Sequence, residues 1–176
     1  MSQSNDSCEF NVLALDPFHG GSHRHFLDGV VQASRHQWNV ISGKPVNWKW
    51  RMRSAPLDLA QRSSDLIGKV GYPDLLFCSD MLDLPVFRGL LRDPRILTTP
   101  TVIYFHENQW SYPVSPSARV DNHFGYTNLL SAIAADEIWF NSQYHLSDFL
   151  SASQAFLRRM PDTRRPHELE TLEQKS

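Results

Sequence analysis

A short turn with two glycines separates an apolar run from a segment with helical spacing, and its side chains are well suited to chemistry. The apolar run covers residues 10–15, and the turn reads DPFHGGSH over residues 16–23. Such a turn leaves the backbone N–H groups of Gly20, Gly21 and a helix-capping Ser22 at a helix N-terminus, where the peptide dipoles favour negative charge. The sequence therefore predicts a site for a phosphate or another anion beside Asp16.

The two glycines also have an explanation without a ligand, because many strand-to-helix turns need glycine for a positive φ angle. Their spacing fits neither the dinucleotide fingerprint G-x-G-x-x-G nor the P-loop, so a nucleotide-dependent dehydrogenase and an NTPase are disfavoured. His23 and His25 would lie in the first helical turn, where the dipole disfavours a positive imidazole. We expect neutral donors or surface residues at these two positions, and a freer His19 on the loop.

Three polar residues, His106, Glu107 and Asn108, directly follow the apolar run at residues 102–105. A histidine at that place could hydrogen-bond a sugar hydroxyl or lie beside a leaving diphosphate. Glu107 could orient or deprotonate an attacking hydroxyl. The alternative is structural, with Asn108 capping the next turn and Glu107 in solvent.

Basic and aromatic residues gather in one segment that contains Lys44, Trp48, Lys49, Trp50, Arg51 and Arg53. Arginine and lysine bind phosphates, and an exposed tryptophan offers a face on which a base stacks. On helical spacing Trp48 and Met52 face inward, whereas Trp50, Arg51 and Arg53 do not. An RNA contact and a solvated helix start with one buried tryptophan both fit this pattern.

The composition is that of a soluble globular domain. The chain has 176 residues, of which 41% are hydrophobic and 20% charged, and its formal net charge is −2. One domain with a real core fits this length, and the small charge implies no bulk attraction to nucleic acid. Cys8 and Cys78 make neither a disulfide framework nor a zinc site, and Cys78 is expected as a buried thiol. Residues 1–7 are polar and no apolar run approaches about 18 residues, so we expect a cytoplasmic protein.

Apolar runs alternate with segments of helical spacing along the chain. Strands are expected at residues 10–15, 38–42, 74–79, 101–105 and 137–140. Helices are expected from residue 22 and over residues 57–70, 84–92 and 124–135. Pro56 should split the second helical segment or delay its start, and Gly71 should end it. This alternation predicts an α/β fold with a doubly wound, parallel, Rossmann-like sheet covered on both faces.

The ends of the chain differ from its middle. We expect residues 1–9 to be disordered, residues 10–160 to form the Rossmann-like lobe, and residues 161–176 to be a polar linker or tail. Ligands of an open parallel sheet collect outside the carboxyl ends of its strands. The polar residues that follow the predicted strands should therefore share one edge with Asp16 and His106, and they include Ser79, Asp80, Asn141 and Ser142.

Taken in order, these motifs resemble the N-terminal lobe of the tRNA-queuosine mannosyltransferases. The blocks that carry the resemblance are DPFHGGSH at residues 16–23, WKWRMR at 48–53, YFHENQ at 104–109 with Tyr112 and Pro113, and FNS at 140–142. The resemblance implies a GT-B enzyme with two Rossmann-like lobes. Such an enzyme moves mannose from GDP-mannose onto the cyclopentene diol of queuosine in a tRNA anticodon, with retention at the anomeric carbon.

The resemblance also implies roles for individual residues, with the glycine turn facing the donor diphosphate and His106 touching the donor sugar. The residues expected in catalysis are His106, Glu107 and Asp16. Those expected to bind the donor and its phosphates are Gly20, Gly21, Ser22, His23, Asn141 and Ser142. Those expected to bind the acceptor tRNA are Asn108, Lys49, Trp50, Arg51 and Arg53. No metal ion or other cofactor is expected, and no membrane partner.

The chain departs from the family pattern at its end, because related enzymes continue into a second lobe with two glutamates eight positions apart. The glutamates here, at positions 9, 107, 137, 168, 170 and 173, include no such pair. We therefore expect an incomplete donor site, a C-terminal lobe in cis or in trans as a partner, and weak or no activity of the isolated chain. The alternatives are a catalytically inactive tRNA-binding module and a truncated product with no task.

Overall fold

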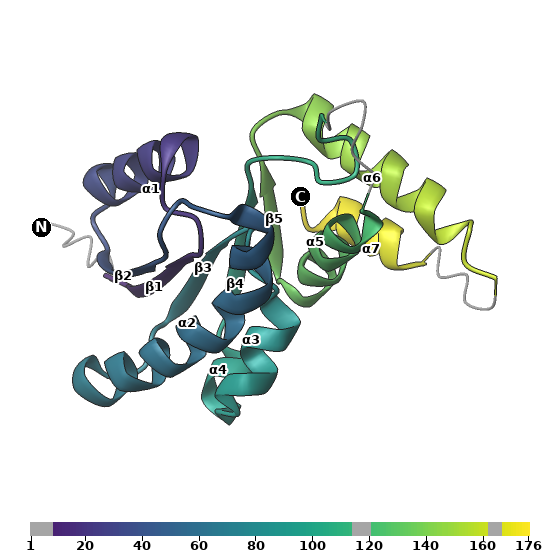
Figure 1. Cartoon of the computed structure of the whole chain (residues 1–176). Helices are drawn as coiled ribbons and strands as arrows, with labels where there is room; N and C mark the ends of the chain where they lie inside the picture. Colours follow the sequence, from purple (N-terminus) through teal and green to yellow (C-terminus); the bar gives the residue numbers. More distant parts are fainter. Residues whose placement is uncertain (1–8, 114–120, 162–166) are drawn as a thin grey trace, which may run out of the picture.

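The computed structural model describes residues 9–113, 121–161 and 167–176, and it contains one five-stranded sheet (Figure 1). The strands are β1 (Asn11–Asp16), β2 (Gln37–Ser42), β3 (Leu75–Ser79), β4 (Thr101–Phe105) and β5 (Glu137–Phe140). Every neighbouring pair is parallel, and the spatial order is β2-β1-β3-β4-β5. This confirms the predicted doubly wound, Rossmann-like sheet. The strand order reverses between β1 and β3, where ligands of such sheets bind.

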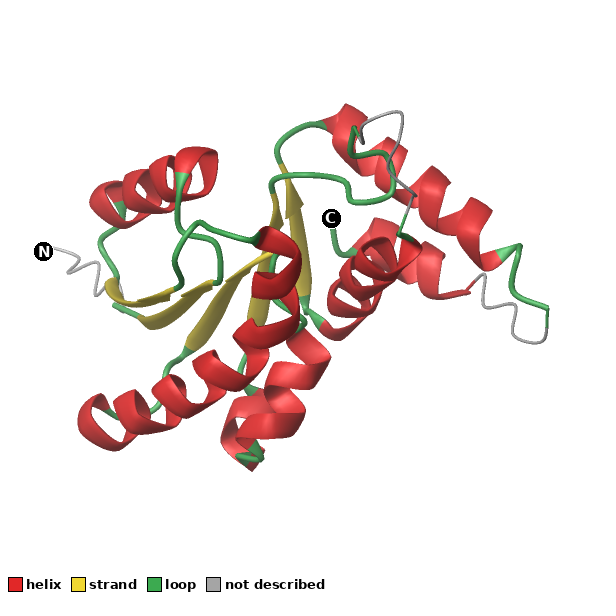
Figure 2. Cartoon of the chain, in the orientation of Figure 1, coloured by secondary structure: helices red, strands yellow, loops and turns green. Residues whose placement is uncertain are grey.

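Helices follow the strands in the order expected for this class (Figure 2). They are α1 (Gly21–Ala33), α2 (Trp48–Val70), α3 (Leu84–Leu91), α4 (Pro94–Thr98), α5 (Asn122–Ala134), α6 (Gln143–Leu157) and α7 (His167–Gln174). Gly71 ends α2 with a φ of 88°, as predicted. Three helices, α4, α6 and α7, lie in segments for which no helix or strand was expected. Residues 1–8, which hold most of the segment expected to be disordered, lie outside the described residues.

The two faces of the sheet are covered by different helices. On one face Leu13 belongs to a large core that includes Phe87 of α3 and residues of α2, α5, α6 and α7. On the other face Ala14 packs in a smaller core with Leu27 of α1. Figure 1 shows α1 on one side of the sheet, with α2 and α3 on the other. Successive strand residues alternate between the two cores, as the pleat requires.

The prediction that Pro56 divides its helical segment is wrong, because α2 is continuous from Trp48 to Val70 with Pro56 inside it. A proline inside a helix costs about 3 kcal/mol because it removes one backbone hydrogen bond and crowds the preceding turn. Here Met52, Ala55 and Leu59 are buried on either side of it. Each large buried side chain contributes about 1.5–3 kcal/mol, so the burial offsets the loss.

The prediction that residues 161–176 form a polar tail is wrong for the part that the structure describes, because residues 167–174 form α7. Leu172 is 1% exposed and belongs to the main core. The N–H of Ile138 in β5 donates to the carbonyl of Lys175 at 2.9 Å, and the Lys175 ammonium donates to the carbonyls of Ile133 and Ala135 at 3.0 and 2.8 Å. The lobe therefore extends through α7 to the edge of β5.

Two further expectations concern cysteine and membranes. Cys78 of β3 is buried, as predicted, and burial raises the pKa of its thiol to about 12. Cys8 lies outside the described residues. Within the described ranges, no helix has the length and apolar character needed to span a bilayer.

Candidate functional site

The carboxylate of Asp16 ends β1 and joins two neighbouring strands at the switch point. It is 2% exposed, and it accepts hydrogen bonds from Ser79 Oγ at 3.0 Å and from the His19 ring at 2.9 Å. An ionised carboxylate only accepts, so His19 carries its proton on Nδ1. Burial alone would raise the pKa of Asp16, but the contacts with His23, His19 and Ser79 outweigh it and lower that pKa. Asp16 is therefore an ionised anchor for the turn.

His23 of α1 lies against His106, which follows β4. Their ring centroids are 3.8 Å apart and the ring planes differ by 29°. The stacking places the glycine turn and the polar trio after β4 at the same edge of the sheet, as the strand pattern predicts. Tyr104 and Phe26 contact the edges of the same His106 ring, at centroid distances of 4.7 and 5.4 Å.

The two stacked histidines have opposite pKa shifts. Burial would lower the pKa of His23, but the carboxylates of Asp16, Asp80 and Glu107 raise it overall. Burial, aided by the positive charge of His23, lowers the pKa of His106 to about 4. A proton on this pair is therefore favoured on His23 over His106.

His23 does not lie on the surface, which was one of the two alternatives expected for it. Its side chain is 4% exposed, and its raised pKa favours the charged ring more than that of a free histidine. The helix dipole does disfavour a cation there, but it contributes only about 0.3–1 kcal/mol and three carboxylates oppose it. His25, two residues on, is exposed as expected.

Asp80 follows β3 and supports the loop after β4. It is 0% exposed, its Oδ2 accepts from the Glu107 N–H at 3.4 Å, and its carbonyl accepts from Asn128 Nδ2 at 2.7 Å. Burial raises the pKa of Asp80 to about 7. Its position after a strand predicted its place at this edge, whereas its contact with the Glu107 backbone had no signal in the sequence.

The two glycines of the turn are required for different reasons. Gly21 has a φ of 55°, and a Cβ built there has no neighbour within 4 Å among the described residues, so the backbone angle is what selects glycine. Gly20 has extended backbone, but a Cβ there would lie 2.3 Å from the Pro45 side chain. The space in front of Gly21 is therefore open, while that beside Gly20 is filled.

Ser22 does not cap α1, contrary to expectation. The N-cap is Gly20, no side chain in the described part of the chain caps the first turn, and Ser22 is exposed one residue inside the helix. The helix begins at Gly21, one residue before the expected start at Ser22. The first-turn N–H groups of α1 are thus left for another acceptor, and such groups attract an anion.

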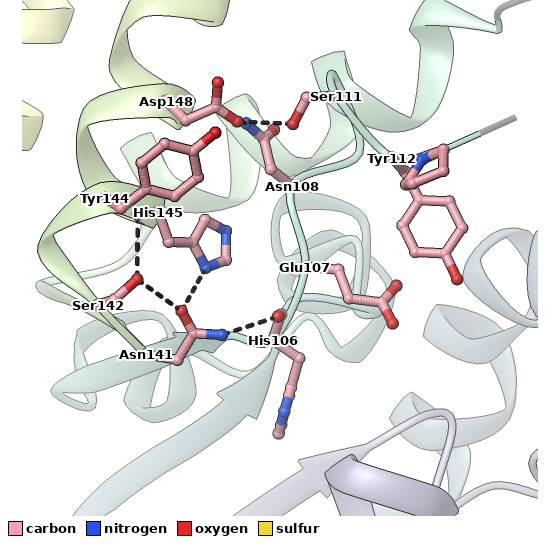
Figure 3. Close-up of a pocket in the computed structure, with 11 residues that line it drawn as sticks. His106, Glu107, Asn108, Ser111, Tyr112, Asn141, Ser142, Tyr144, His145 and Asp148 are labelled. Carbon is pink, nitrogen blue, oxygen red and sulfur yellow. Dashed lines mark hydrogen bonds between the residues drawn. The ribbon is translucent and has the colours of Figure 1, made fainter.

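A pocket of about 290 Å³ opens between the loop after β4 and the start of α6 (Figure 3). We call it the larger pocket. Its lining residues are His106, Glu107, Asn108, Ser111, Tyr112, Pro113, Asn141, Ser142, Tyr144, His145 and Asp148. Six of them, Ser111, Tyr112, Pro113, Tyr144, His145 and Asp148, were not among the expected site residues. Tyr112 and Pro113 had a signal in their motif, whereas the three residues of α6 depend on where that helix lies.

Several expected ligand residues hold the wall of this pocket together. Asn141 Nδ2 donates to the His106 carbonyl at 3.1 Å, and its Oδ1 lies 3.1 Å from His145 Nδ1 (Figure 3). The Ser142 hydroxyl accepts from the His145 N–H at 3.2 Å and so caps α6. Asn108 Oδ1 accepts from the Trp110 N–H at 3.1 Å, which confirms the alternative that Asn108 caps the next turn.

A smaller pocket of about 70 Å³ adjoins the larger one. It is lined by Phe18, His23, Trp48, Met81, Glu107 and Tyr112. Glu107 and Tyr112 therefore line both pockets. Glu107 therefore lies at the boundary between the larger pocket and the smaller pocket, which His23 also lines.

The basic and aromatic cluster, apart from Lys44, forms the first turns of α2, next to the smaller pocket. Trp48 lines that pocket and packs against Phe124 with centroids 5.0 Å apart, and Met52 is buried, as predicted. Trp50 is 74% exposed and Lys49 is also exposed, so both are accessible to a partner. Arg51 is partly buried, with its Nε in the protein interior.

Arg53 is held in place on the surface of the same cluster. Its guanidinium lies 5.2 Å from the centre of the Phe124 ring and 3.8 Å from the Asp121 carboxylate. Among the side chains that the structure describes, no group of three or more histidine, cysteine, aspartate or glutamate residues is placed to hold a metal ion.

Fold and site together define a Rossmann-like lobe with an anion-suited turn and a polar edge at its switch point. The chain matches the family described as tRNA-queuosine alpha-mannosyltransferase N-terminal over residues 11–176, and it belongs to that family. It is also 35% identical over 166 residues to a tRNA-queuosine alpha-mannosyltransferase of Drosophila melanogaster. That alignment covers 94% of this chain and 42% of the relative, so the chain spans less than half of the relative's length. No solved structure matches the chain significantly.

Proposed function

We propose that the chain is the N-terminal lobe of a retaining GT-B enzyme that transfers mannose from GDP-mannose to queuosine in tRNA. Its family membership supports the reaction class. The observation that carries the proposal is the 3.8 Å stacking of His23 on His106, because it unites the glycine turn and the polar trio in one site.

The donor diphosphate is assigned to the N-terminus of α1. The open space at Gly21, the uncapped N–H groups and the raised pKa of His23 all favour an anion at that point. His106 has a pKa lowered to about 4, so at neutral pH it is an uncharged imidazole suited to hydrogen-bond a sugar hydroxyl. This assignment keeps positive charge near the phosphates and neutral groups near the sugar.

Glu107 is assigned to orient the attacking hydroxyl of the acceptor, because its side chain lies between the two pockets. In retaining transfer on one face of the sugar, the leaving phosphate takes the proton. Asp16 is buried and already accepts hydrogen bonds from His19 and Ser79. We therefore assign Asp16 to positioning His19 and His23, in place of a direct catalytic role.

The tRNA is assigned to the exposed start of α2, through Lys49, Trp50, Arg51 and Arg53. The 74% exposure of Trp50 beside Lys49 also favours the second candidate function, a tRNA-binding module without activity. The two functions share this surface and differ at His106 and Glu107.

A C-terminal lobe, in cis or in trans, completes the donor site in this proposal. A helix N-terminus contributes about 0.3–1 kcal/mol to an anionic contact, while micromolar affinity needs about 8 kcal/mol. The chain alone should therefore bind GDP-mannose weakly and transfer slowly. We propose that the reaction takes place in the cytoplasm and needs no metal ion.

The test is mannosyl transfer from labelled GDP-mannose to queuosine-containing tRNA. The chain is assayed alone and joined to the C-terminal lobe of the Drosophila relative. We expect transfer by the joined protein, a loss of at least about 100-fold in His106→Ala with tRNA binding kept, and little change in the exposed control His25→Ala. Full activity of His106→Ala would refute the enzymatic proposal, and tRNA binding without transfer by any form would favour the binding module.

A further inference from the structure

The larger pocket is acidic, although both proposed substrates, GDP-mannose and tRNA, carry phosphates. Among the described residues, its lining includes the carboxyl side chains of Glu107 and Asp148 and no lysine or arginine. Its two histidines add no positive charge, because burial lowers the pKa of His106 to about 4 and also lowers that of His145. A diphosphate would be repelled here, whereas a cation or a neutral polyol would be attracted.

The side chain of Asp148, near the start of α6, is held in one orientation. Its Oδ2 accepts from Asn108 Nδ2 and from Ser111 Oγ, both at 2.6 Å. These contacts tie α6 to the loop after β4 and pre-organise the carboxylate before any ligand arrives. A preorganised carboxylate binds a hydroxyl or an ammonium group without the cost of ordering itself.

His145 is a largely buried ring in the wall of the pocket. It is 6% exposed, its Nδ1 lies 3.1 Å from Asn141 Oδ1, and its ring also interacts with the Glu107 backbone. Figure 3 shows its ring turned towards the loop that carries Glu107 and Asn108. The contacts with Asn141 and the Glu107 backbone fix the ring between α6 and the loop after β4, so this wall of the pocket is formed before a ligand arrives.

Aromatic rings flank the pocket on opposite sides. Tyr144 of α6 is 79% exposed and Tyr112 is 43% exposed, and Figure 3 shows them on either side of the polar groups. Exposed aromatic faces stack on nucleobases. The volume of about 290 Å³ fits a small ring and is at the lower end of ligand pockets, too small for a whole nucleotide sugar.

We propose that the larger pocket binds the modified end of queuosine, the cyclopentene diol with its secondary ammonium group, between the carboxylates of Glu107 and Asp148. This inference rests on the proposed function and names the acceptor subsite within it. The ammonium and the two hydroxyls donate to the carboxylates, and the deazaguanine base stacks on Tyr144. The diol then lies beside Glu107, which also lines the smaller pocket next to His23.

The inference is tested by direct binding to the chain, followed by NMR amide shifts. The probes are queuosine nucleoside, 7-aminomethyl-7-deazaguanosine, which keeps an ammonium but lacks the diol, and guanosine, which has neither. We expect shifts in the 106–113 loop and at the start of α6, with affinity falling in that order. Asp148→Asn should weaken queuosine binding about ten-fold, the effect of losing one charged hydrogen bond, while Asp65→Asn on the exposed face of α2 should not.

Two results would overturn the inference: equal binding of queuosine and guanosine, or shifts of these resonances by GDP-mannose in preference to queuosine. If Asp148→Asn does not fold, Glu107→Gln tests the second carboxylate with the same probes. The proposed function fails separately. Queuosine binding without mannosyl transfer by the joined protein would contradict the enzymatic proposal alone, whereas transfer with an unchanged KM for tRNA in Asp148→Asn would contradict the acceptor subsite alone.

Discussion

The imidazole of His23 lies flat against that of His106, with centroids 3.8 Å apart, and the two rings have opposite pKa shifts. Burial, together with the positive charge of His23, lowers the pKa of His106 to about 4. Replacing His23 by alanine should therefore raise the pKa of His106 towards the ordinary value of about 6.5. NMR titration of the ring protons measures this, and His25→Ala is the control. An unchanged pKa of His106 in His23→Ala would show that the rings are not coupled.

Asp80 should make the stability of the chain depend on pH. Burial raises its pKa in the folded protein to about 7, above the ordinary value of about 3.9, so the folded state binds the proton more tightly. This contribution to the free energy of unfolding is present at low pH and is lost as the pH rises from about 4 to about 7. Asp80→Asn should remove it. Urea unfolding at pH 5 and pH 7.5 should show the variant gaining stability relative to the wild type at the higher pH, and a constant difference would contradict the burial effect.

Two glycines of α1 should respond to alanine in opposite directions. Gly21 has a φ of 55°, where an L-residue is strained, so Gly21→Ala should destabilise the fold by about 1–2 kcal/mol. Gly29 lies inside the same helix, exposed, and a Cβ there meets no described atom within 4 Å. Gly29→Ala should stabilise by about 0.5–1 kcal/mol. Thermal or urea unfolding measures both, and a stabilising Gly21→Ala would show that the turn relaxes.

Lys49 and Arg53 should contribute to tRNA affinity by neutralising phosphates. Replacing both by alanine should weaken binding and lower the slope of log affinity against log salt by about 1 for each phosphate that is no longer neutralised. Arg51 is a poorer choice because its Nε is in the protein interior, so its replacement would also disturb packing. Arg62→Ala, further along α2 and paired with Asp58 at 3.2 Å, is the matched control. Filter binding of tRNA over a salt series measures the slopes for the wild type and the double variant. Equal slopes would remove this surface from the proposed tRNA site.

Leu172 should be essential to the lobe although its segment is charged. It is 1% exposed and packs in the main core, so Leu172→Ala should destabilise by about 2–5 kcal/mol. Leu57→Ala is the control, because Leu57 is 68% exposed on α2. Chemical unfolding should show a clearly lower free energy of unfolding for Leu172→Ala than for Leu57→Ala. Equal stabilities would mean that α7 does not dock on the lobe in solution.

Much of the fold was predictable because buried parallel strands are continuous apolar runs. The expected strands at residues 101–105 and 137–140 agree with β4 and β5, and the others agree within one residue. α7 escaped prediction because Leu172 is its fully buried hydrophobic residue among charged neighbours, which gives little periodic signal. The continuity of α2 escaped it because the burial that offsets Pro56 comes from tertiary contacts.

The candidate site was predictable where residues directly follow strands, as for Asp16, Asp80 and His106. It was not predictable where a property arises from distant partners. The raised pKa of His23 depends on carboxylates at the carboxyl ends of three different strands. Asp148 meets Asn108 across 40 positions of sequence, and its place depends on the direction of α6. The capping role of Asn108, in contrast, is local and was anticipated as the structural alternative.

Glu107 and Tyr112 form a shared partition between the two pockets. Any molecule that moves either side chain from one compartment changes the shape that the neighbouring compartment presents. Two substrates that occupy these compartments together are therefore thermodynamically linked, and each should alter the affinity of the other by the same factor. A single partition of two residues thus makes ordered or synergistic substrate addition an expected property of this lobe.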